Sequence, residues 1–385
     1  MKKKITIFGS TGSIGESALD IIKHHPDKYE VVGLTANKNY KKLLEQVKLF
    51  NPKVISISDK DSFKNFKNIN KYNVEVLNGE SSYDEILDYD TDLVIAAITG
   101  AIGLMPVVST LRKGITLALA NKESLVCSGM LVTKLAQKQN VKILPVDSEH
   151  NAIYQVLDYK NKSLVSKLIL TASGGPFLNH NYEQLKNVTP KEAVKHPNWS
   201  MGKKISIDSA TMMNKGLELI EAFFLFDIPH SQIEVLVHPE SIIHSCVEYV
   251  DGSVLSQMGT PDMRTPISYT LAYPTRISTN VERLNLSKVG KLTFFPPCFD
   301  KFPCLSLAYE SLKIQKSAPA VLNAANEVAV EAFLNKKIKF VSIPKIVEKT
   351  LNKTSFYELN SIKDVIEADI EAREYASELI KTGFN

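Results

Sequence analysis

The first 147 residues alternate short apolar segments with amphipathic ones, and this alternation limits the folds available to the chain. The expected strands are Lys4–Phe8, Tyr29–Leu34, Lys53–Ser58, Leu93–Ala97, Thr116–Ala120 and Val141–Pro145. The clearest helical stretches between them are Gly15–His24, Tyr40–Phe50 and Ser128–Gln139. Strands that alternate with helices form a parallel sheet with helices on both faces.

A glycine-rich turn, Gly9-Ser-Thr-Gly-Ser-Ile-Gly15, follows the first expected strand and leads into the first expected helix. Glycines permit a tight turn and a close approach to a pyrophosphate, while the helix N-terminus supplies N–H donors. The spacing is G-x-x-G-x-x-G rather than G-x-G-x-x-G, and such a turn can also simply close a βα unit. Its place at the first βα connection favours a Rossmann-like, cofactor-binding domain over residues 1–147.

The end of the second expected strand indicates which nicotinamide cofactor this domain takes. It reads Gly33-Leu-Thr-Ala-Asn-Lys-Asn39 and holds no Asp or Glu for a ribose 2′-hydroxyl, which NAD sites normally supply. Lys38 and Asn39 can instead meet a 2′-phosphate, although a solvated Lys38 in a first helical turn is the alternative. The sequence therefore predicts NADP(H) rather than NAD(H).

The rest of the chain changes character twice. Residues 148–275 are predicted to be a central α/β catalytic domain with a partly antiparallel sheet. Its expected helices are Glu149–Asp158 and a long helix at Ala210–Phe226. Its expected strands are Leu164–Thr171, Ile233–Val237, Ser245–Tyr249 and Ser253–Gln257. Residues 276–304 have little pattern and are predicted to be a linker. Residues 305–385 are predicted to be a helical bundle with helices at Leu305–Gln315, Pro319–Leu334, Ile343–Leu351 and Ser361–Lys381.

Composition narrows the class of protein. Apolar residues make up 44% and charged residues 23% of 385 residues, and the net charge is only +4, which does not favour nucleic-acid binding. No apolar run approaches the roughly 20 residues that span a bilayer, and we expect no membrane association and no signal or transit peptide. The four cysteines form no C-x-x-C pair, which is typical of reduced thiols in a cytoplasmic protein.

Three carboxylates suggest a metal site. Asp147 and Glu149 flank Ser148 after the last expected strand, and residues two apart in extended chain face the same side. Glu218 lies about seventy positions later on the expected long helix. Oxygen ligands alone favour Mg²⁺ or Mn²⁺. Each acid taken singly can be a helix cap or a surface charge, but the three together favour one ion.

Hydroxyl, amide and amine groups near these acids suggest an anion pocket. Ser173 lies in a Ser-Gly-Gly turn after a strand, and Ser209 is expected at the start of the long helix, where it can cap the helix, meet an anion, or do both. Asn214 and Lys215 precede Glu218 by four and three positions and so share its helix face. We expect these groups to bind the phosphate of a small substrate.

Two further segments complete the expected site. Asn121, Lys122 and Glu123 follow a strand at the edge where ligands bind, although a Lys-Glu pair is often only a surface ion pair. Residues 196–204 contain His196 and Trp199, the only tryptophan, and are predicted to form a lid that excludes water; a core position is the alternative for Trp199. His238 and His244 are interpreted as structural or interfacial.

These motifs, taken together and in this order, resemble the 1-deoxy-D-xylulose 5-phosphate reductoisomerase family along essentially the whole chain. The matching segments are Gly9–Gly15, Ala120–Ser124, Val146–His150, Ser173–Phe177, His196–Gly202, Asp208–Glu218 and Gly259–Pro266. The resemblance implies the NADPH- and metal-dependent rearrangement and reduction of 1-deoxyxylulose 5-phosphate to 2-C-methylerythritol 4-phosphate, the second step of a route to isoprenoids. It also implies a homodimer. Asn37 departs from the Gly that we expect there in many members.

The resemblance assigns roles residue by residue. The residues that match metal ligands are Asp147, Glu149 and Glu218. Those that match substrate contacts are Lys122, Ser148, Ser173, His196, Ser209, Asn214 and Lys215, with Trp199 and Met201 in the lid. Those that match NADPH contacts are Thr11, Gly12, Ser13, Ile14, Lys38, Asn39, Asn121, Glu123 and Gly202.

Two other functions use the same cofactor domain. A metal-independent NADP dehydrogenase for a small aldehyde would keep its activity after exhaustive chelation. A regulatory protein that senses NADPH would bind the cofactor but turn over no sugar phosphate. The three acids favour the metal-dependent enzyme over both.

The missing acid after the second strand yields a test of cofactor choice. We expect kcat/KM with NADPH to exceed that with NADH by at least about tenfold, because only a 2′-phosphate can meet Lys38 and Asn39. Steady-state kinetics with both cofactors measure this ratio. Comparable values for the two would contradict the preference.

Overall fold

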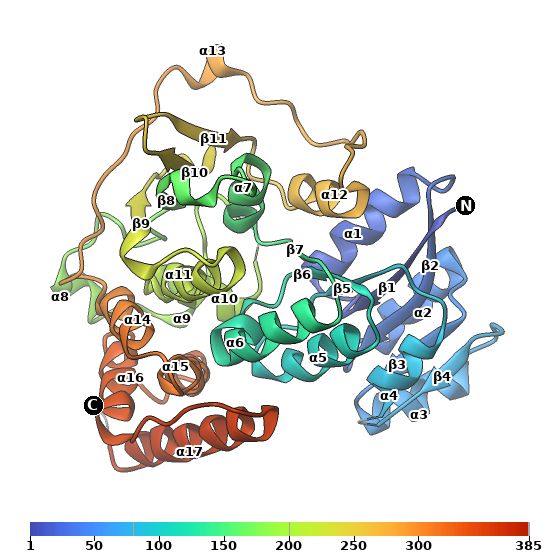
Figure 1. Ribbon diagram of the computed structural model, residues 1–385. Helices are drawn as coiled ribbons and strands as arrows, with labels where there is room; N and C mark the ends of the chain where they lie inside the picture. Colours follow the sequence, from blue (N-terminus) through green and yellow to red (C-terminus); the bar gives the residue numbers. More distant parts are fainter. Residues whose placement is uncertain (80, 200, 384–385) are drawn as a thin grey trace. The chain divides into compact units, whose positions relative to one another are not determined.

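The protein is described here by a computed structural model that covers residues 1–79, 81–199 and 201–383. The chain divides into two compact units (Figure 1). Unit 1 comprises Met1–Ser124, Val132–Asn151 and Met263–Val281, and unit 2 comprises Leu125–Leu131, Ala152–Asp262 and Glu282–Asn385. Among the described residues, none of the helices combines the length and the apolar character needed to cross a membrane.

Unit 1 is built on a parallel sheet of seven strands in the order β4-β3-β2-β1-β5-β6-β7. Its strands are β1 (Lys3–Phe8), β2 (Tyr29–Ala36), β3 (Val54–Ile57), β4 (Glu75–Leu77), β5 (Leu93–Ala96), β6 (Thr116–Leu119) and β7 (Ile143–Pro145). The chain runs outward from β1 to β4 and returns to β5 on the other side of β1. The sheet order therefore reverses between β1 and β5, where open α/β sheets bind ligands.

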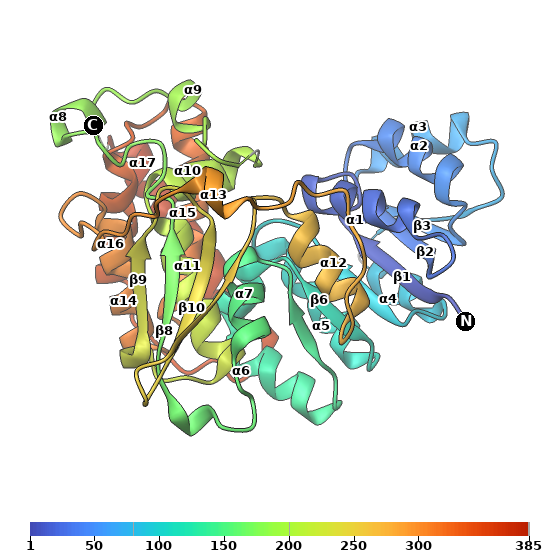
Figure 2. The same cartoon turned by 90° about the horizontal axis from the view of Figure 1, so that it is seen from above.

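Helices cover both faces of this sheet. They are α1 (Ser13–His24), α2 (Tyr40–Phe50), α3 (Lys60–Ile69), α4 (Ser82–Glu85), α5 (Leu104–Arg112) and α12 (Arg264–Ala272). Figure 2 shows α1, α2 and α3 on one face and α4 and α5 on the other. All four residues of β3 and of β5 are buried. Burial on both faces explains why β5 is continuously apolar and why β3 is apolar except at Ser56.

Two helices contribute residues to both units. They are α6 (Lys122–Lys138) and α7 (Ser148–Val156). The first contains a non-helical residue, Ser128, with φ −145° and ψ 29°.

Unit 2 contains a mixed sheet of four strands in the order β11-β10-β8-β9. The strands are β8 (Val165–Ala172), β9 (Ile233–Val237), β10 (Ile243–Tyr249) and β11 (Val254–Met258). β10 is antiparallel to both β8 and β11, whereas β8 and β9 are parallel. Short helices α8 (Tyr182–Leu185), α9 (Pro190–Ala193) and α13 (Leu286–Val289) lie in the connections.

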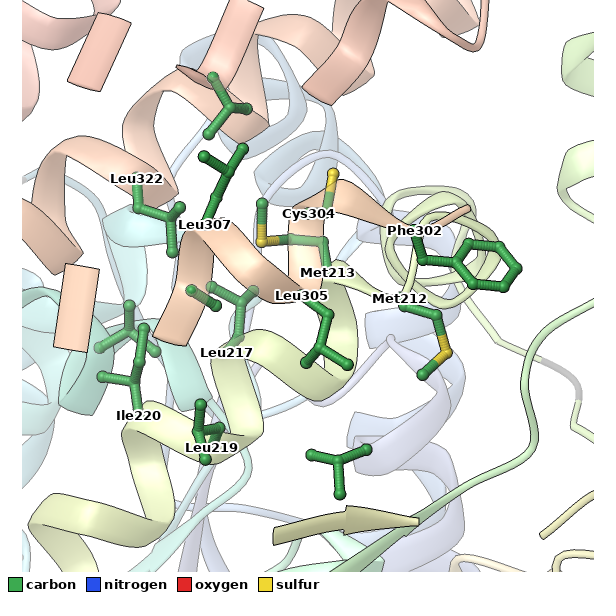
Figure 3. Close-up of a cluster of buried hydrophobic side chains, with 14 of the residues drawn as sticks. Met212, Met213, Leu217, Leu219, Ile220, Phe302, Cys304, Leu305, Leu307 and Leu322 are labelled. Carbon is green, nitrogen blue, oxygen red and sulfur yellow. The ribbon is translucent and has the colours of Figure 1, made fainter. Parts of the chain in front are cut away.

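The longer helices of unit 2 pack against one another and against this sheet. They are α10 (Lys203–Ala210), α11 (Met213–Phe226), α14 (Pro303–Ile314), α15 (Ala318–Leu334), α16 (Ser342–Lys353) and α17 (Ile362–Lys381). A single apolar core runs from the sheet into the helices (Figure 3). α11 lies against α14 so closely that a Cβ on Gly216 would stand 2.5 Å from the Cβ of Ala308.

The predicted fold class is confirmed: a parallel sheet of Rossmann type, a mixed second sheet and C-terminal helices are all present. β4, α3 and α5 had not been predicted. The two units differ from the predicted division at residues 147, 275 and 304, because α12 groups with unit 1 and the C-terminal helices share the core of the mixed sheet. The three-domain division stays a prediction.

The prediction of one long helix over Ala210–Phe226 is wrong at its start. α10 ends at Ala210 and α11 begins at Met213, because Met212 has φ 62° and ψ 6°, in the left-handed region. A helix cannot continue through that conformation, so the chain turns between two helices.

The variant Leu217→Ala tests whether the core shared by the sheet and the helices stabilises unit 2. It is fully buried on α11 and packs near α14 and α15 (Figure 3). We expect Leu217→Ala to lower the free energy of unfolding by about 2–5 kcal/mol, because it leaves a cavity. Leu286→Ala, at an exposed position in α13, should change it by less than about 0.5 kcal/mol. Urea denaturation of both variants measures the difference; equal effects would contradict this account of the core.

Candidate active site

The glycine turn after β1 is built to present backbone donors. Gly9 has φ +81°, and a Cβ there would lie 2.8 Å from the carbonyl oxygen of Ala97, which follows β5. Gly15 is equally restricted, because a Cβ would lie 2.5 Å from Ser10. Gly12 precedes α1, no side chain caps this helix, and Gly12 and Ser13 are exposed. The first N–H groups of α1 are thus not capped by the side chain of the residue before the helix, which leaves them available to a pyrophosphate.

The residues after β2 lie on the surface. Lys38 and Asn39 are both exposed, and Asn39 caps α2 by accepting a hydrogen bond from the N–H of Lys42 (3.3 Å). Thr35, inside β2, accepts the N–H of Gly9 at 2.9 Å. The second strand is therefore tied to the glycine turn, and the two candidate residues for a 2′-phosphate follow directly after it.

The segment after β6 is buried rather than superficial. Lys122 is 5% and Glu123 4% exposed, so the interpretation as a surface ion pair is wrong. Asn121 caps α6 through the N–H of Ser124 (3.0 Å) and donates to the carbonyl of Ile98 (2.7 Å). Its side-chain amide thus joins the ends of β5 and β6.

Asp147 is the centre of a buried polar cluster at the carboxyl edge of the same sheet. Its Oδ2 lies 2.7 Å from Nζ of Lys122, and its Oδ1 lies 3.2 Å from Nδ1 of His150. Glu149 donates its N–H to Oδ1 of Asp147 (3.2 Å), and its Oε2 accepts the hydroxyl of Ser148 (2.6 Å). One carboxylate oxygen of Asp147 and one of Glu149 lie within 4.8 Å of each other.

The prediction that Asp147 and Glu149 face the same side of an extended chain is wrong. β7 ends at Pro145 and α7 begins at Ser148, so Glu149 lies in the first turn of a helix. Asp147 accepts an N–H of that turn, as the capping alternative proposed. Helix geometry, rather than strand alternation, brings these two carboxylates together.

The first two turns of α11 carry three of the candidates of unit 2. Lys215 and Glu218 are 4% and 1% exposed, and the Lys215 ammonium is paired with Oε2 of Glu218. Asn214 donates to the other oxygen, Oε1. Both oxygens of Glu218 are thus oriented by neighbours on its own helix face, as the spacing predicted.

Ser209 does not lie where the sequence suggested. It occupies the last turn of α10 instead of the start of a helix, so it is not an N-cap. It lies at the negative, C-terminal end of the dipole of α10. Its backbone nevertheless lies beside the Ser-Gly-Gly turn: a Cβ on Gly175 would stand 2.6 Å from the carbonyl oxygen of Ser209. Ser173 and Ser209 are therefore in neighbouring segments.

Ser173 and His196 are hydrogen bonded. Oγ of Ser173 lies 3.0 Å from Nε2 of His196 and accepts the N–H of Gly175 (3.1 Å). Burial, and secondarily the positive charge of Lys215, lower the pKa of His196 from 6.5 to about 4. The imidazole is therefore neutral near pH 7.

The expected lid is partly helical. α10 begins at Lys203, with Gly202 exposed before it, so the described loop residues of this segment are 196–199, 201 and 202. Ser200 lies outside the described residues. Trp199 is half-buried, and its ring centroid lies 6.1 Å from that of His244 in β10. Met201 is half-buried as well.

Three buried polar residues, His150, Glu221 and Asp208, were not predicted to belong to the site. His150 contacts Asp147, and Glu221 lies one turn after Glu218 on α11. Asp208 accepts Nδ2 of Asn326 (2.8 Å) and pairs with Lys204 (2.9 Å). Glu221 repeats the spacing of Lys215 and Glu218, which is a signal that sequence analysis can use.

His238 is structural, as interpreted from the sequence. Its Nδ1 lies 2.9 Å from the carbonyl of Thr293, and its Nε2 accepts the N–H groups of Ile242 and Ile243 at 3.2 Å each. The segment before Ile243 is not a strand, contrary to expectation.

Each unit therefore presents its own set of groups. Unit 1 offers two carboxylates and open helical N–H donors at one sheet edge, which suit a hard cation and a pyrophosphate. Unit 2 offers hydroxyl, amide and ammonium donors around one buried acid, with the His196 imidazole hydrogen bonded to Ser173, and these groups suit a phosphate. That Glu218 joins Asp147 and Glu149 on one ion remains a prediction.

Comparison with known proteins gives consistent matches along the chain. A family model described as 1-deoxy-D-xylulose 5-phosphate reductoisomerase matches residues 5–129. Two models described as the C-terminal domain of this reductoisomerase match residues 143–226 and 258–375. A relative from Thermoanaerobacter sp. (strain X514), named 1-deoxy-D-xylulose 5-phosphate reductoisomerase, is 51% identical over 373 residues, which cover 97% of this chain and 98% of the relative.

Solved structures agree with these matches. The 1-deoxy-D-xylulose 5-phosphate reductoisomerase from Zymomonas mobilis in complex with NADPH is 48% identical, with a TM-score of 0.93 and full coverage of both chains. A DOX-P reductoisomerase in complex with NADPH, fosmidomycin and magnesium is 44% identical, with a TM-score of 0.93 and 98% coverage of each chain.

The lowered pKa of His196 gives a pH prediction. The unfolded chain binds this proton below about pH 6.5, and the folded chain only near pH 4. The stability that this group contributes is thus fully present above about pH 6.5 and is lost as the pH falls toward 4. Nitrogen-15 NMR, assigned with His196→Gln, should show a neutral ring at pH 5.5. Titration near 6.5 would contradict the burial.

Proposed function

The chain belongs to the 1-deoxy-D-xylulose 5-phosphate reductoisomerase family, and from this premise we propose the reaction it performs. It rearranges 1-deoxy-D-xylulose 5-phosphate and reduces it with NADPH to 2-C-methyl-D-erythritol 4-phosphate, with a divalent metal ion. This is the second step of the methylerythritol phosphate route to isoprenoid precursors. The protein is thus an NADP-dependent oxidoreductase that also isomerises its substrate.

The glycine turn and the residues after β2 and β6 would hold NADPH. The fit rests on the open N–H groups of α1 and on Gly9 and Gly15, where side chains would block the turn. Lys38 and Asn39 are exposed at the position expected for the 2′-phosphate. Bound NADPH supplies a hydride. The remaining proposed contacts are Thr11, Gly12, Ser13, Ile14, Asn121, Glu123 and Gly202.

Asp147, Glu149 and Glu218 would hold the metal. All three offer carboxylate oxygens, the donors that Mg²⁺ and Mn²⁺ prefer, and Lys122 and Lys215 orient two of them. A bound divalent ion polarises substrate oxygens as a Lewis acid. Lys122 and Ser148 lie beside these acids and are proposed to contact the substrate's hydroxyl groups.

Unit 2 is proposed to bind the phosphate end of the substrate. Ser173 is hydrogen bonded to His196, the charge of Lys215 acts on His196, and Ser209 adjoins the Gly175 turn. Asn214 shares the first turn of α11 with Lys215. Trp199 and Met201 are proposed to cover the substrate and exclude water, which keeps the reducing equivalent from side reactions.

The observation that carries this function is the pair of acids at the carboxyl edge of the nucleotide-binding sheet. A dehydrogenase that works without a metal has no use for Asp147 and Glu149 in that position. A protein that only senses NADPH has no use for the phosphate donors of unit 2. The relatives with NADPH and with magnesium support the same choice.

Assembly and location are proposed separately. The family resemblance supports a homodimer, which sedimentation analysis tests. The four cysteines are free thiols, as is usual in a reducing compartment, and this supports a cytoplasmic protein.

Glu218→Gln tests the metal site. We expect kcat with 1-deoxyxylulose 5-phosphate to fall by at least about a hundredfold, because a lost carboxylate ligand costs several kcal/mol of charge stabilisation. The dissociation constant for NADPH should remain within about twofold. Glu234→Gln, at an exposed position on β9, serves as the control and should retain activity.

The assay follows NADPH oxidation with and without added Mg²⁺ or Mn²⁺. Activity that survives exhaustive chelation, or full turnover by Glu218→Gln, would refute the metal-dependent reaction.

A further inference from the structure

Asn198 joins the loop before α10 to a second segment of unit 2. Its side-chain Nδ2 donates to the carbonyl of Pro239 (2.8 Å) and to Oγ of Ser241 (2.9 Å). Both hydrogens of the amide are thus directed at one short segment. An amide that donates both of its hydrogens to one segment fixes the two segments relative to each other.

The receiving segment is itself firmly held. Ser241 has φ 53°, a left-handed conformation that is uncommon for a residue other than glycine, and its N–H bonds the carbonyl of His238 (3.1 Å). The buried His238 ring accepts the N–H groups of Ile242 and Ile243. Residues 238–243 therefore form a rigid support for Asn198.

The same loop fixes the hydrogen-bond direction of His196. The backbone N–H groups of Asn198 and Trp199 both point at Nδ1 of His196, at 3.2 Å and 3.0 Å. Since a backbone N–H can only donate, Nδ1 must be the unprotonated nitrogen. The neutral ring then carries its hydrogen on Nε2 and donates it to Oγ of Ser173, 3.0 Å away.

The hydroxyl of Ser173 consequently has fixed donor and acceptor roles. A hydroxyl oxygen has two acceptor positions and one donor hydrogen. The two acceptor positions are filled by the N–H of Gly175 and by Nε2–H of His196. The hydroxyl hydrogen is left to donate to an acceptor such as an oxyanion.

We propose that Asn198 is a positioning residue for the phosphate end of the substrate. By fastening the loop to residues 239–241, it holds His196 as an Nε2–H donor, and through His196 it holds Ser173 as a donor to a phosphate oxygen. The role of His196 in this arrangement is to orient Ser173 and not to transfer a proton. This inference rests on the proposed function only in naming the ligand as a phosphate.

Three variants test the proposal in the full-length chain. Asn198→Ala removes both side-chain donors without adding charge, and Ser241→Ala removes one of the two acceptors. Asn187→Ala is the matched control, because Asn187 is exposed and its amide bonds only the carbonyl of Glu183 among the described contacts (3.3 Å). Circular dichroism and thermal melting establish that each variant is folded.

The first readout is binding of inorganic phosphate, which requires no turnover. We expect Asn198→Ala to raise its dissociation constant, and the KM for 1-deoxyxylulose 5-phosphate, on the order of tenfold, and Ser241→Ala about threefold. kcat and the NADPH dissociation constant should change by less than about threefold, because the hydride-transfer groups are untouched. The second readout is nitrogen-15 NMR of His196, where Asn198→Ala should reduce the population of the Nε2–H form.

The outcomes distinguish the positioning role of Asn198 from the proposed reaction. Phosphate binding and a His196 tautomer that are the same in Asn198→Ala as in Asn187→Ala would overturn the positioning role. If Asn198→Ala fails to fold, the same two measurements on Ser241→Ala decide. A chain that shows the expected phosphate shifts but does not turn over the sugar phosphate would keep this inference and refute the proposed reaction.

Discussion

Buried charge is the constraint on which both units depend. A carboxylate removed from water is stable only with a partner, and loss of the partner costs several kcal/mol. In unit 1 the Lys122 ammonium lies 2.7 Å from Asp147, and in unit 2 Lys215 pairs with Glu218, with every one of these side chains at most 11% exposed. The pairs hold each acid in a defined direction, so the same interactions that make burial tolerable also orient the groups proposed to bind the ion.

Most strands of unit 1 could be predicted because they are largely apolar and buried on both faces of the sheet. β1, β2, β5 and β6 begin within one residue of their expected positions, since a buried strand in a parallel sheet leaves a largely apolar signal. β4 was missed because it has three residues and none is buried. The two units could not be derived from the chain order, since the grouping of α12 with unit 1 depends on packing between segments more than a hundred residues apart.

The identities of the candidate site residues could be predicted better than their local geometry. Asp147 and Glu149 were recognised as a pair, but for a strand rather than for the helix start that they occupy. Ser209 was misplaced because Met212 adopts φ 62°, and nothing in a methionine signals a left-handed turn. His150 and Asp208 were missed although their ion-pair partners, Asp147 and Lys204, lie only three and four positions away, a spacing that sequence analysis can use.

The segment predicted to be a linker, residues 276–304, is held on both sides of an exposed middle part. Nε2 of His25 lies 2.8 Å from the carbonyl oxygen of Ser278, and the hydroxyl of Thr260 donates to the carbonyl of Glu282 (2.6 Å). Phe295 forms a backbone bridge with Val237, the Phe294 ring stacks on His238 (4.7 Å between centroids), and Thr293 bonds Glu240. Exposed residues fill most of the stretch from 282 to 292. Insertions and deletions during evolution should therefore accumulate between residues 283 and 292, where the chain is mostly exposed and its length can vary. A residue added between Thr293 and Phe295 would instead break the register of these paired residues.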